Sequence, residues 1–338
     1  MPDVADVAVI IPAFNSAAHI DQALASVAGQ TVPPSTVVVA DDCSTDDTVE
    51  RARRWQGRLP LEVIPLDQNQ GPGIARDRAI KATRAALLAM LDADDLFLPD
   101  HLETMVSMHT AHPGLVSAQE LWWYPGLDLK VRTSPRGMVK ASYELDRLLR
   151  DNFVNFGFFS RDLYETVGGF RFSKQPGEDW DLWIRMVRAG ASLTMAAHPT
   201  AIHRMRPGSL TWDPARTAEG AVVVLSAALQ AARTPREAAA TRAELRTLKS
   251  KVCFYRAIEL VAQGRLRQAR RVALTALPAG GPRSTVGLLA LAAAPATAAK
   301  LERLTRAYRL PMEPGFRQTK SLLPPGLSPV IAPGTALE

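Results

Sequence analysis

Four aspartates crowd the stretch "LLAMLDADDLFLPDHL", residues 87–102. Asp92, Asp94 and Asp95 come directly after five apolar residues, and Asp100 follows five positions later. Carboxylates packed this closely repel one another, which raises their pKa values unless a cation or hydrogen-bond donors offset the repulsion. Asp92 and Asp94 occupy positions i and i+2, so their side chains point the same way if a strand continues through them. Two carboxylates so arranged suit a hard divalent cation, Mn²⁺ or Mg²⁺.

A metal site of this kind also indicates what the protein binds. Mg²⁺ held by one or two carboxylates usually keeps several waters and takes its remaining ligands from substrate phosphates, and we expect the same of Mn²⁺ here. The stretch therefore predicts a phosphate-bearing substrate. The alternative interpretation is a solvated turn in which Asp94 or Asp95 caps a helix that opens near Pro99.

Two more polar clusters could contact such a substrate. In "DDCSTDD", Asp41 and Asp42 offer carboxylate acceptors to the N–H and O–H donors of a nucleotide base or ribose. In "NQGPGIARDRAI", the glycines permit close backbone approach, and Arg76 can reach a phosphate or the aspartates of the metal site. Neither the G-x-x-x-x-G-K pattern of a P-loop nor the G-x-G-x-x-G pattern of a dinucleotide site is present there.

A third acidic cluster opens an amphipathic helical pattern in "GEDWDLWIRM". Glu178, Asp179 and Asp181 are available for acid–base chemistry, because a carboxylate can accept the proton of a reacting hydroxyl. The structural alternative is that these residues only complement the positive N-terminal end of the helix dipole. From this segment alone, both interpretations stay open.

Alternating apolar runs and helical patterns must position these clusters. Four short apolar segments read as strands, and three helical patterns separate them: strands at 7–11, 36–40, 61–66 and 86–91; helices at 16–30, 44–56 and 73–85. This series predicts a doubly wound, mostly parallel α/β sheet, whose ligands lie beyond the carboxyl ends of the strands. Further along, the patterns predict strands at 115–124 and 155–160 and a helix at 179–190. The polar clusters fall at the ends of the first four strands, which favours one shared binding cleft.

The charge balance divides the chain. Residues 1–215 hold 21 Lys+Arg against 27 Asp+Glu, and residues 216–338 hold 19 against 7, a balance of +12. Beyond residue 215 the sequence becomes rich in Ala, Leu and Arg, which predicts helices. We therefore expect a catalytic domain at 1–215, a basic helical region at 216–320 for dimerisation or acceptor binding, and a Pro-rich tail at 321–338.

Composition favours a cytoplasmic protein, either soluble or peripheral to the inner face of a membrane. The two cysteines, Cys43 and Cys253, cannot build a disulfide framework or a zinc site. The N-terminus reads as a first strand rather than a signal peptide, because it has no basic segment before its apolar run. The longest apolar run, residues 286–299, contains a proline and falls short of the roughly 20 residues that a spanning helix needs.

Five motifs in order carry a resemblance to a known family: "VIIPAFN", "DDCSTDDT", "NQGPGIARDRAI", "LDADD" and "GGFRFSKQPGEDWDLWIRMVRAG". Over residues 5–212 the chain resembles the family-2 glycosyltransferases of the GT-A fold, which are inverting, metal-dependent enzymes. The resemblance implies a Rossmann-like domain that moves one sugar from a nucleotide-diphosphate sugar, favouring a UDP-sugar, to an acceptor hydroxyl. The Q-x-x-R-W signature of processive members is absent, which favours a single transfer per encounter.

The resemblance also implies roles for individual residues. Asp94 and Asp92 would form the DXD metal site, and Asp179 would be the catalytic base. The remaining members would contact the nucleotide sugar: Pro12, Phe14, Asp42, Arg76, Asp92, Ala93, Asp95 and Arg206. Arg206 stands where the family often has a histidine that contacts the metal or diphosphate, and an arginine there can bind the diphosphate directly.

Two other functions are compatible with the same residues. A sugar-phosphate nucleotidyltransferase also joins a Rossmann-like sheet to metal-binding aspartates, but it usually has a Gly-rich, Arg-containing loop after the first strand, where this chain has "PAFNS". A binding protein that lost the chemistry is the second alternative. The acceptor, whether a saccharide, a lipid-linked molecule or a small natural product, is not indicated by the sequence, and no nucleic acid partner is expected.

Overall fold

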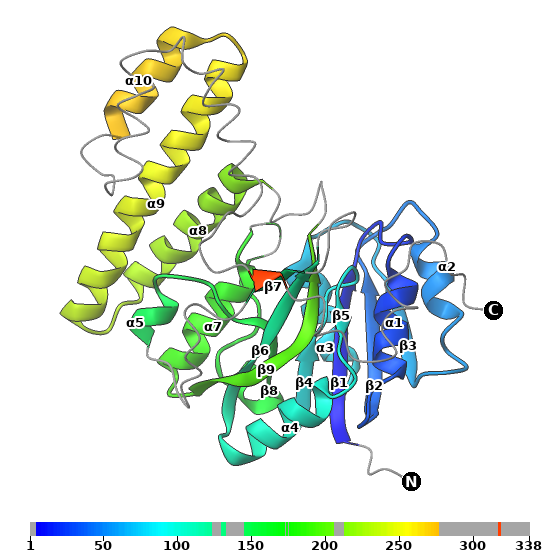
Figure 1. The fold of residues 1–338 in the computed structure, drawn as a ribbon. Coiled ribbons are helices and arrows are strands. Elements are labelled where there is room, and N and C mark those ends of the chain that lie inside the picture. The colour runs from blue at the N-terminus through cyan, green and yellow to red at the C-terminus, as the bar shows by residue number, and fades with distance from the viewer. Residues whose placement is uncertain are drawn as a thin grey trace.

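The computed structural model describes residues 5–123, 130–132, 145–172, 174, 176–205, 213–276 and 317–318. It contains a central twisted sheet with helices on both faces and a helical hairpin that extends away from the sheet (Figure 1). Our predictions for residues 206–212, which include Arg206, and for most of 277–338, which include the Pro-rich tail, lie outside the described residues.

One half of the sheet is parallel, as the alternating pattern predicts. Its strands stand in the order β3-β2-β1-β4, and every neighbouring pair among them is parallel. The strands are β1 (Ala5–Ala13), β2 (Pro34–Asp41), β3 (Leu61–Pro65) and β4 (Leu87–Met90). Their connecting helices are α1 (Ile20–Ala28), α2 (Thr48–Arg53) and α3 (Pro72–Ala82). The four predicted strands and three predicted helices are confirmed, with shorter helices than the patterns suggested.

The other half of the sheet is mixed. Strand β8 is antiparallel to both β4 and β6, whereas β6 and β9 run parallel. The strands here are β5 (Leu96–Phe97), β6 (Gly114–Trp123), β7 (Lys130–Arg132), β8 (Asn155–Ser160), β9 (Ser192–Arg204) and β10 (Arg317–Gln318). The helices are α4 (His101–Ala111), α5 (Leu145–Leu148), α6 (Arg161–Thr166) and α7 (Glu178–Arg188). The strands predicted at 115–124 and 155–160 and the helix at 179–190 are confirmed.

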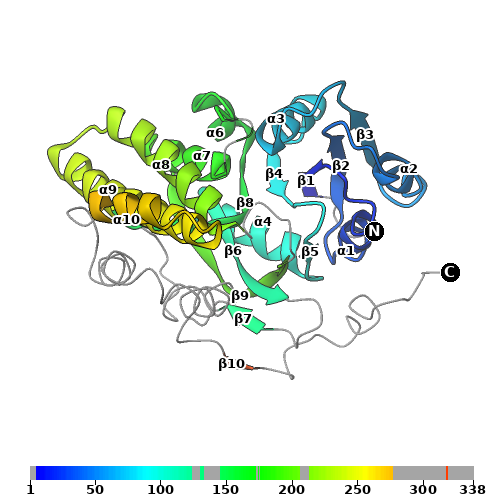
Figure 2. The ribbon, with the colours of Figure 1, turned by 90° about the horizontal axis from the view of Figure 1, so that it is seen from above.

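Alternate residues of β1 and β2 divide the apolar core into two layers. Ile10 and Val38 point into the layer that contains α3 and α7, whereas Val9 and Val37 point into the layer that contains α1 and α4. Seen from above, α3 and α1 lie on opposite sides of β1 and β2 (Figure 2). Both faces of these strands are buried, which is why their sequences are continuously apolar rather than alternating.

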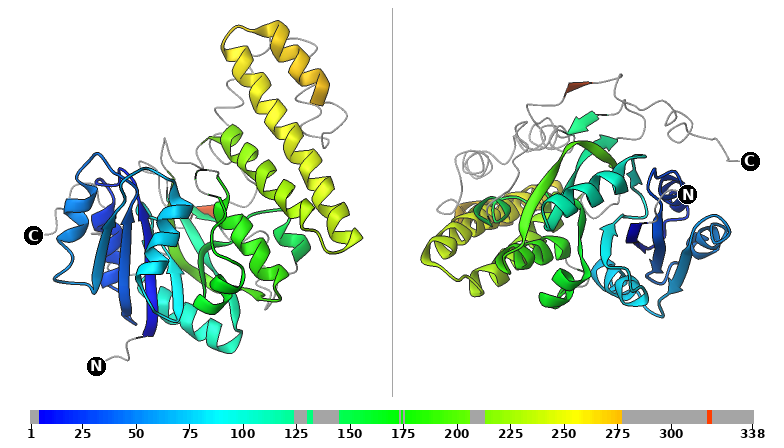
Figure 3. Two further views of the ribbon diagram at one scale, coloured as in Figure 1. Left: turned by 180° about the vertical axis from the view of Figure 1, so that it is seen from behind. Right: turned by 90° about the horizontal axis from the view of Figure 1, so that it is seen from below.

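The C-terminal helices share the core of the sheet. They are α8 (Pro214–Gln230), α9 (Pro235–Ala262) and α10 (Leu266–Ala276), and α9 and α10 extend beyond the body of the protein (Figure 3). Val224 and Leu225 of α8 and Leu245 of α9 belong to the same buried cluster as Ile10 of β1. The helices expected after residue 215 are thus present as far as residue 276, and the apolar core continues across that boundary.

Candidate active site

The aspartates after β4 form a tight turn rather than a continuation of the strand. The backbone N–H of Asp95 donates to the Asp92 carbonyl at 3.0 Å. Asp92 and Asp94 are half-buried at the surface of this turn, whereas Ala93 and Asp95 are only 3% exposed. Two carboxylates on the outer side of the turn match the i, i+2 arrangement that suits a divalent cation, although a turn and not a strand produces it.

The capping alternative for these aspartates is wrong. Helix α4 begins at His101, and Asp100 occupies its N-cap position. Asp95 instead points inward, where its two carboxylate oxygens accept from the Arg204 backbone N–H at 2.8 Å and pair with His203 Nδ1 at 2.9 Å. Asp95 therefore ties the turn to the end of β9.

His203 is a half-buried partner of Asp95 that no motif in the sequence signals. Burial by itself lowers the pKa of His203, but the adjacent Asp95 carboxylate more than offsets this and raises it to about 10. Burial also raises the pKa of Asp95, to about 7, so the two side chains share a proton across this contact. His203 was not recognised because nothing in "HRMRPGS" shows that it meets a residue 108 positions away.

Arg76 joins the aspartate turn to helix α7. Its guanidinium donates to Asp92 Oδ1 and to Glu178 Oε1, both at 2.5 Å. The side chains of Arg76 and Glu178 are 9% and 7% exposed, whereas that of Asp92 is 45% exposed. Burial lowers the pKa of Arg76, but the two carboxylates outweigh burial and raise it, so the arginine is permanently charged. Of the aspartates that we expected Arg76 to reach, Asp92 lies within hydrogen-bond distance.

Asp179 lies beside this ion-pair network at the start of α7. Its Oδ1 accepts from the Trp180 backbone N–H at 2.6 Å, and Asn152 Nδ2 lies 3.3 and 3.4 Å from its two oxygens. Burial raises the pKa of Asp179 above its ordinary value, and Arg76 and these donors only partly counter the effect. A half-buried carboxylate with a raised pKa suits a general base. Asn152 is a contact that no motif in the sequence signalled.

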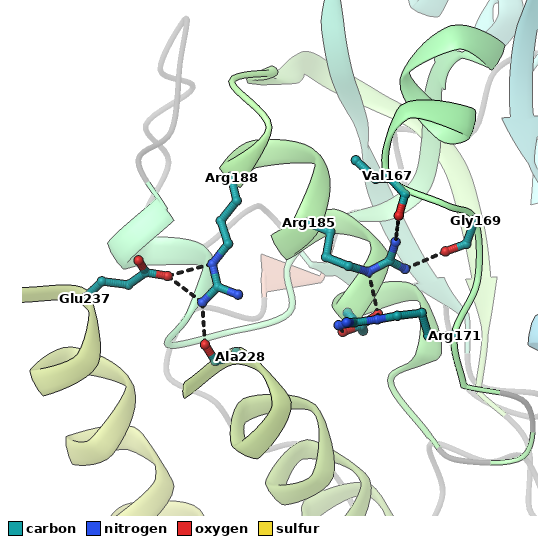
Figure 4. Close-up of polar contacts among 8 residues, drawn as sticks. Val167, Gly169, Arg171, Arg185, Arg188, Ala228 and Glu237 are labelled. Atoms are coloured by element: carbon teal, nitrogen blue, oxygen red, sulfur yellow. Dashed lines mark hydrogen bonds and ion pairs between the residues drawn. The ribbon is translucent and has the colours of Figure 1, made fainter. Parts of the chain in front are cut away.

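Asp181 serves the structure of α7. It is 2% exposed and accepts from the Nε atoms of Arg171 and Arg185 at 3.0 and 2.8 Å. Arg185 also donates to the carbonyls of Val167 and Gly169 (Figure 4). Asp181 stands in the first turn of the helix and, with these two arginines, it fixes the loop that precedes α7.

The nucleotide-contact residues expected near β1 and β2 differ in accessibility. Phe14, directly after β1, is 45% exposed, so its ring is available to stack on a base. Pro12 is buried within β1. Asp42 is 3% exposed, and its two oxygens accept from the backbone N–H groups of Gln70 and Gly71, both at 2.7 Å. In this structure Asp42 therefore shapes the loop before α3.

The fit of a divalent cation depends on the substrate. Within the described residues, no three His, Cys, Asp or Glu side chains gather in a way that could hold a metal ion. Asp92 and Asp94 supply two carboxylate groups at the surface of the turn, and diphosphate oxygens are the ligands that would complete such a set. The donor set thus fits a cation that binds together with a nucleotide diphosphate.

None of the described helices combines the length and the apolar character that crossing a bilayer requires. The free thiols Cys43 and Cys253 lie in different parts of the fold, in the turn after β2 and in α9, and neither forms a disulfide.

Curated relatives match a little under two thirds of the chain. Glycosyltransferase AglE of Haloferax volcanii is 31% identical over 236 residues, which cover 64% of this chain and 73% of AglE. Succinoglycan biosynthesis protein ExoO of Rhizobium meliloti is 30% identical over 225 residues, covering 62% of this chain and 63% of ExoO. The chain spans 58% of the length of a second succinoglycan protein, ExoU, which is also 30% identical.

Solved structures share the fold over nearly the whole chain. S. aureus TarS 1-349, in complex with UDP-GlcNAc, superposes with a TM-score of 0.62 at 20% identity, covering 90% of this chain and 89% of TarS 1-349. Mannosyltransferase PcManGT from Pyrobaculum calidifontis, in complex with GDP-Man and Mn²⁺, superposes with a TM-score of 0.60 at 23% identity, covering 92% and 86%. These likenesses confirm the predicted GT-A fold.

The family model for glycosyl transferase family 2 matches residues 8–168, from β1 through α6. This range contains the aspartate turn, Arg76 and the loops after β1 and β2, and the AglE alignment extends the likeness to nearly three quarters of that protein. The chain therefore belongs to glycosyl transferase family 2.

Proposed function

We propose that this protein transfers one sugar from a nucleotide-diphosphate sugar to an acceptor hydroxyl, with inversion at the anomeric carbon. The observation that carries the proposal is the Arg76 bridge, which joins Asp92 of the donor side to Glu178, the neighbour of Asp179. A carboxylate for a metal–diphosphate thereby belongs to this network, and a carboxylate for the acceptor proton lies directly beside it. Inverting transfer needs such groups on opposite sides of the sugar, as inverting glycoside hydrolysis does.

In this proposal each residue of the chain has a distinct task. Asp94 and Asp92 hold a Mn²⁺ or Mg²⁺ ion, which, when bound, stabilises negative charge on the departing diphosphate. Phe14 stacks on the base, and Asp42 holds the loop of Gln70 and Gly71 against the nucleotide. Pro12, Ala93 and Asp95 shape the pocket wall, and Arg206 contacts the diphosphate. Asp179 accepts the proton of the attacking hydroxyl.

A donor screen tests the proposal directly. A UDP-sugar is our first candidate, and the GDP-Man bound to PcManGT makes GDP-sugars the natural comparison. With Mn²⁺ and a donor at 100 times its dissociation constant, the correct donor should stabilise the protein by about 2.7 kcal/mol. Slow hydrolysis of that donor supports a transferase, whereas turnover only of a sugar phosphate with a nucleoside triphosphate would support a nucleotidyltransferase. Binding without any turnover would indicate a protein that lost the chemistry.

Asp94→Ala should abolish metal-dependent nucleotide binding while leaving the fold intact. Removing one of several crowded carboxylates relieves repulsion, so little stability should be lost. Calorimetric titration of nucleoside diphosphate with and without Mn²⁺ measures the effect. Asp100→Ala is the matched control, because it removes a half-buried carboxylate from the same segment that pairs with His198 instead. Tight Mn²⁺-dependent binding by Asp94→Ala would overturn the metal assignment.

For the helical hairpin formed by α9 and α10, we propose contact with an anionic lipid surface rather than dimerisation. On α10, Leu266 and Leu274 are 40% and 48% exposed, and Arg267, Arg270 and Arg271 are exposed beside them, while Ala269 and Ala273 are buried. Three arginines interleaved with two leucines suit the interface of an anionic membrane. A symmetric dimer through this face would bring like charges together, which opposes association.

Sedimentation with vesicles tests this contact. The full chain should bind vesicles that contain phosphatidylglycerol and not vesicles of phosphatidylcholine alone. Arg270→Gln should weaken binding about fivefold, because one basic residue near such a surface contributes about 1 kcal/mol. Leu266→Ser combined with Leu274→Ser should also weaken it, and Val223→Ser on α8, which is 36% exposed, is the control. Equal binding to both vesicle types, or a stable dimer without lipid, would contradict the proposal.

A further inference from the structure

The turn that carries Asp179 into the site is held between two helices. Gly73 of α3 and Gly220 of α8 each face a backbone carbonyl of this turn, that of Phe172 and that of Pro176, respectively. A Cβ atom on either glycine would lie closer to that oxygen than van der Waals contact allows. Because the opposing atoms belong to the backbone, they cannot rotate away. Phe172 is thus held closely against α3 and Pro176 against α8.

Helix α8 also packs against the residue that starts α7. Gly177, the N-cap of α7, has a left-handed backbone conformation with φ of +88°. Val224 Cγ2 of α8 lies 3.4 Å from the position that a Cβ atom on Gly177 would occupy, and Val224 is fully buried. Asp179 stands only two residues beyond this contact. Helix α8 therefore packs closely against the residue that precedes α7, two positions before Asp179.

A buried ion pair anchors the far end of α7 to the same C-terminal helices. Arg188 donates through Nε to Glu237 of α9 and through Nη2 to the Ala228 carbonyl of α8, each at 2.6 Å (Figure 4). Arg233, between α8 and α9, returns a hydrogen bond to the Arg188 carbonyl at 2.8 Å. The side chains of Arg188 and Glu237 are 5% and 7% exposed, so water does not compete for these contacts. Both ends of α7 are therefore fixed to α8 and α9.

We propose that α8 is a positioning element for the catalytic base, and that Gly220 is its critical residue. The inference rests on the proposed role of Asp179 and assigns the C-terminal helices a part in the transfer step. Gly73 packs against Phe172 in the same way, and its helix α3 also carries Arg76. The residues just before α7 therefore contact both the helix that carries Arg76 and the C-terminal helix α8. Misplacing a reacting group by about 1 Å can lower the rate 100-fold. The packing of Pro176 against Gly220 should therefore affect the rate of sugar transfer.

Gly220→Ala tests the inference in the full chain. Alanine favours a helix interior more than glycine does, so α8 should form normally while its new Cβ displaces Pro176. We expect transfer kcat to fall about 100-fold, with donor affinity within twofold of wild type, because the residues that we propose to contact the donor follow β1, β2, β3 and β4 and do not lie on α8. Gly57→Ala is the matched control, since no atom lies within 4 Å of its added Cβ, and its kcat should be unchanged.

A double-mutant cycle separates positioning from a general structural role. If α8 acts through Asp179, Gly220→Ala should have almost no effect on residual transfer in the Asp179→Asn background. Equal losses in both backgrounds, wild-type kcat for Gly220→Ala, or parallel loss of donor affinity would overturn the inference. Near-normal transfer by Asp179→Asn alone would instead overturn the base assignment, and this inference with it. If Gly220→Ala does not fold, Val224→Ala replaces it, because this change removes the side chain that packs beside Gly177. Its effect on transfer is then measured with and without Asp179→Asn in the same way.

Discussion

Replacing Asp179 with Asn is expected to lower the rate of sugar transfer by roughly 10²–10⁴-fold while donor binding survives. Asparagine keeps the size of the side chain and its contacts with Asn152 and the Trp180 N–H, but it cannot accept a proton from the acceptor hydroxyl. The measurement is steady-state transfer with a saturating donor, together with a titration of the donor. Near-normal transfer, or a product with the anomeric configuration of the donor, would contradict the role of Asp179.

The pH dependence provides an independent check on Asp179. Burial raises its pKa, and a base works only when deprotonated, so transfer should increase with pH through a value above that of an ordinary aspartate. The same shift affects stability. A carboxyl group whose pKa is raised by folding destabilises the folded state once pH exceeds the unfolded value. Asp179→Asn should therefore be more stable than wild type at neutral pH, and the difference should vanish in acid, where the aspartate is protonated.

Replacing Arg76 with Met is expected to lower the free energy of unfolding by about 3–5 kcal/mol. The change leaves the buried carboxylate of Glu178 without its guanidinium partner, whereas Asp92 is exposed enough for water to solvate it. Chemical denaturation at neutral pH measures the loss. Metal-dependent donor binding should weaken as well, because Asp92 loses the hydrogen bond that orients it.

A compensating substitution distinguishes an unpaired charge from lost packing. Arg76→Met combined with Glu178→Met removes both members of the buried pair and should recover most of the stability, although not the activity. Burial already raises the pKa of Glu178, so the penalty of Arg76→Met alone should also shrink as pH falls and the carboxyl becomes protonated. A pH-independent loss that the double variant fails to rescue would show that Arg76 stabilises through packing alone.

Local patterns of the sequence were sufficient for the parallel half of the sheet. The apolar runs of β1, β2, β3 and β4 and the polar residues at their ends are properties of neighbouring residues, so β-propensity and turn chemistry reveal them. The same holds for the outward carboxylates of Asp92 and Asp94. The strand does not continue through Asp92 and Asp94, as the i, i+2 argument had assumed. Asp95 bonds the backbone of β9 with its side chain, and its backbone N–H closes a turn onto Asp92.

Contacts between distant segments decided the rest of the site. Arg76 meets Glu178 across 102 positions, and Asp95 meets His203 across 108, and no periodicity or spacing rule connects such pairs. The sequence also suggested Asp42 as a nucleotide ligand, but only the folded chain reveals the backbone N–H groups of Gln70 and Gly71 that occupy its oxygens. Every segment of the chain carries backbone N–H groups that a carboxylate can accept from. Which of them it pairs with therefore depends on the segments that the fold brings close to it.

The sequence by itself determined the family and the α/β class, and it singled out the carboxylates that we propose for the chemistry, since these depend on residue type and short spacing. Only the tertiary structure decided how the C-terminal helices relate to that chemistry. The change of composition at residue 215 suggested a separate region, yet Gly220 and Val224 of α8 pack against the turn that carries Asp179. The physical reason is that an apolar core forms wherever packing buries the most surface, and here it extends from β1 through α7 into α8 and α9.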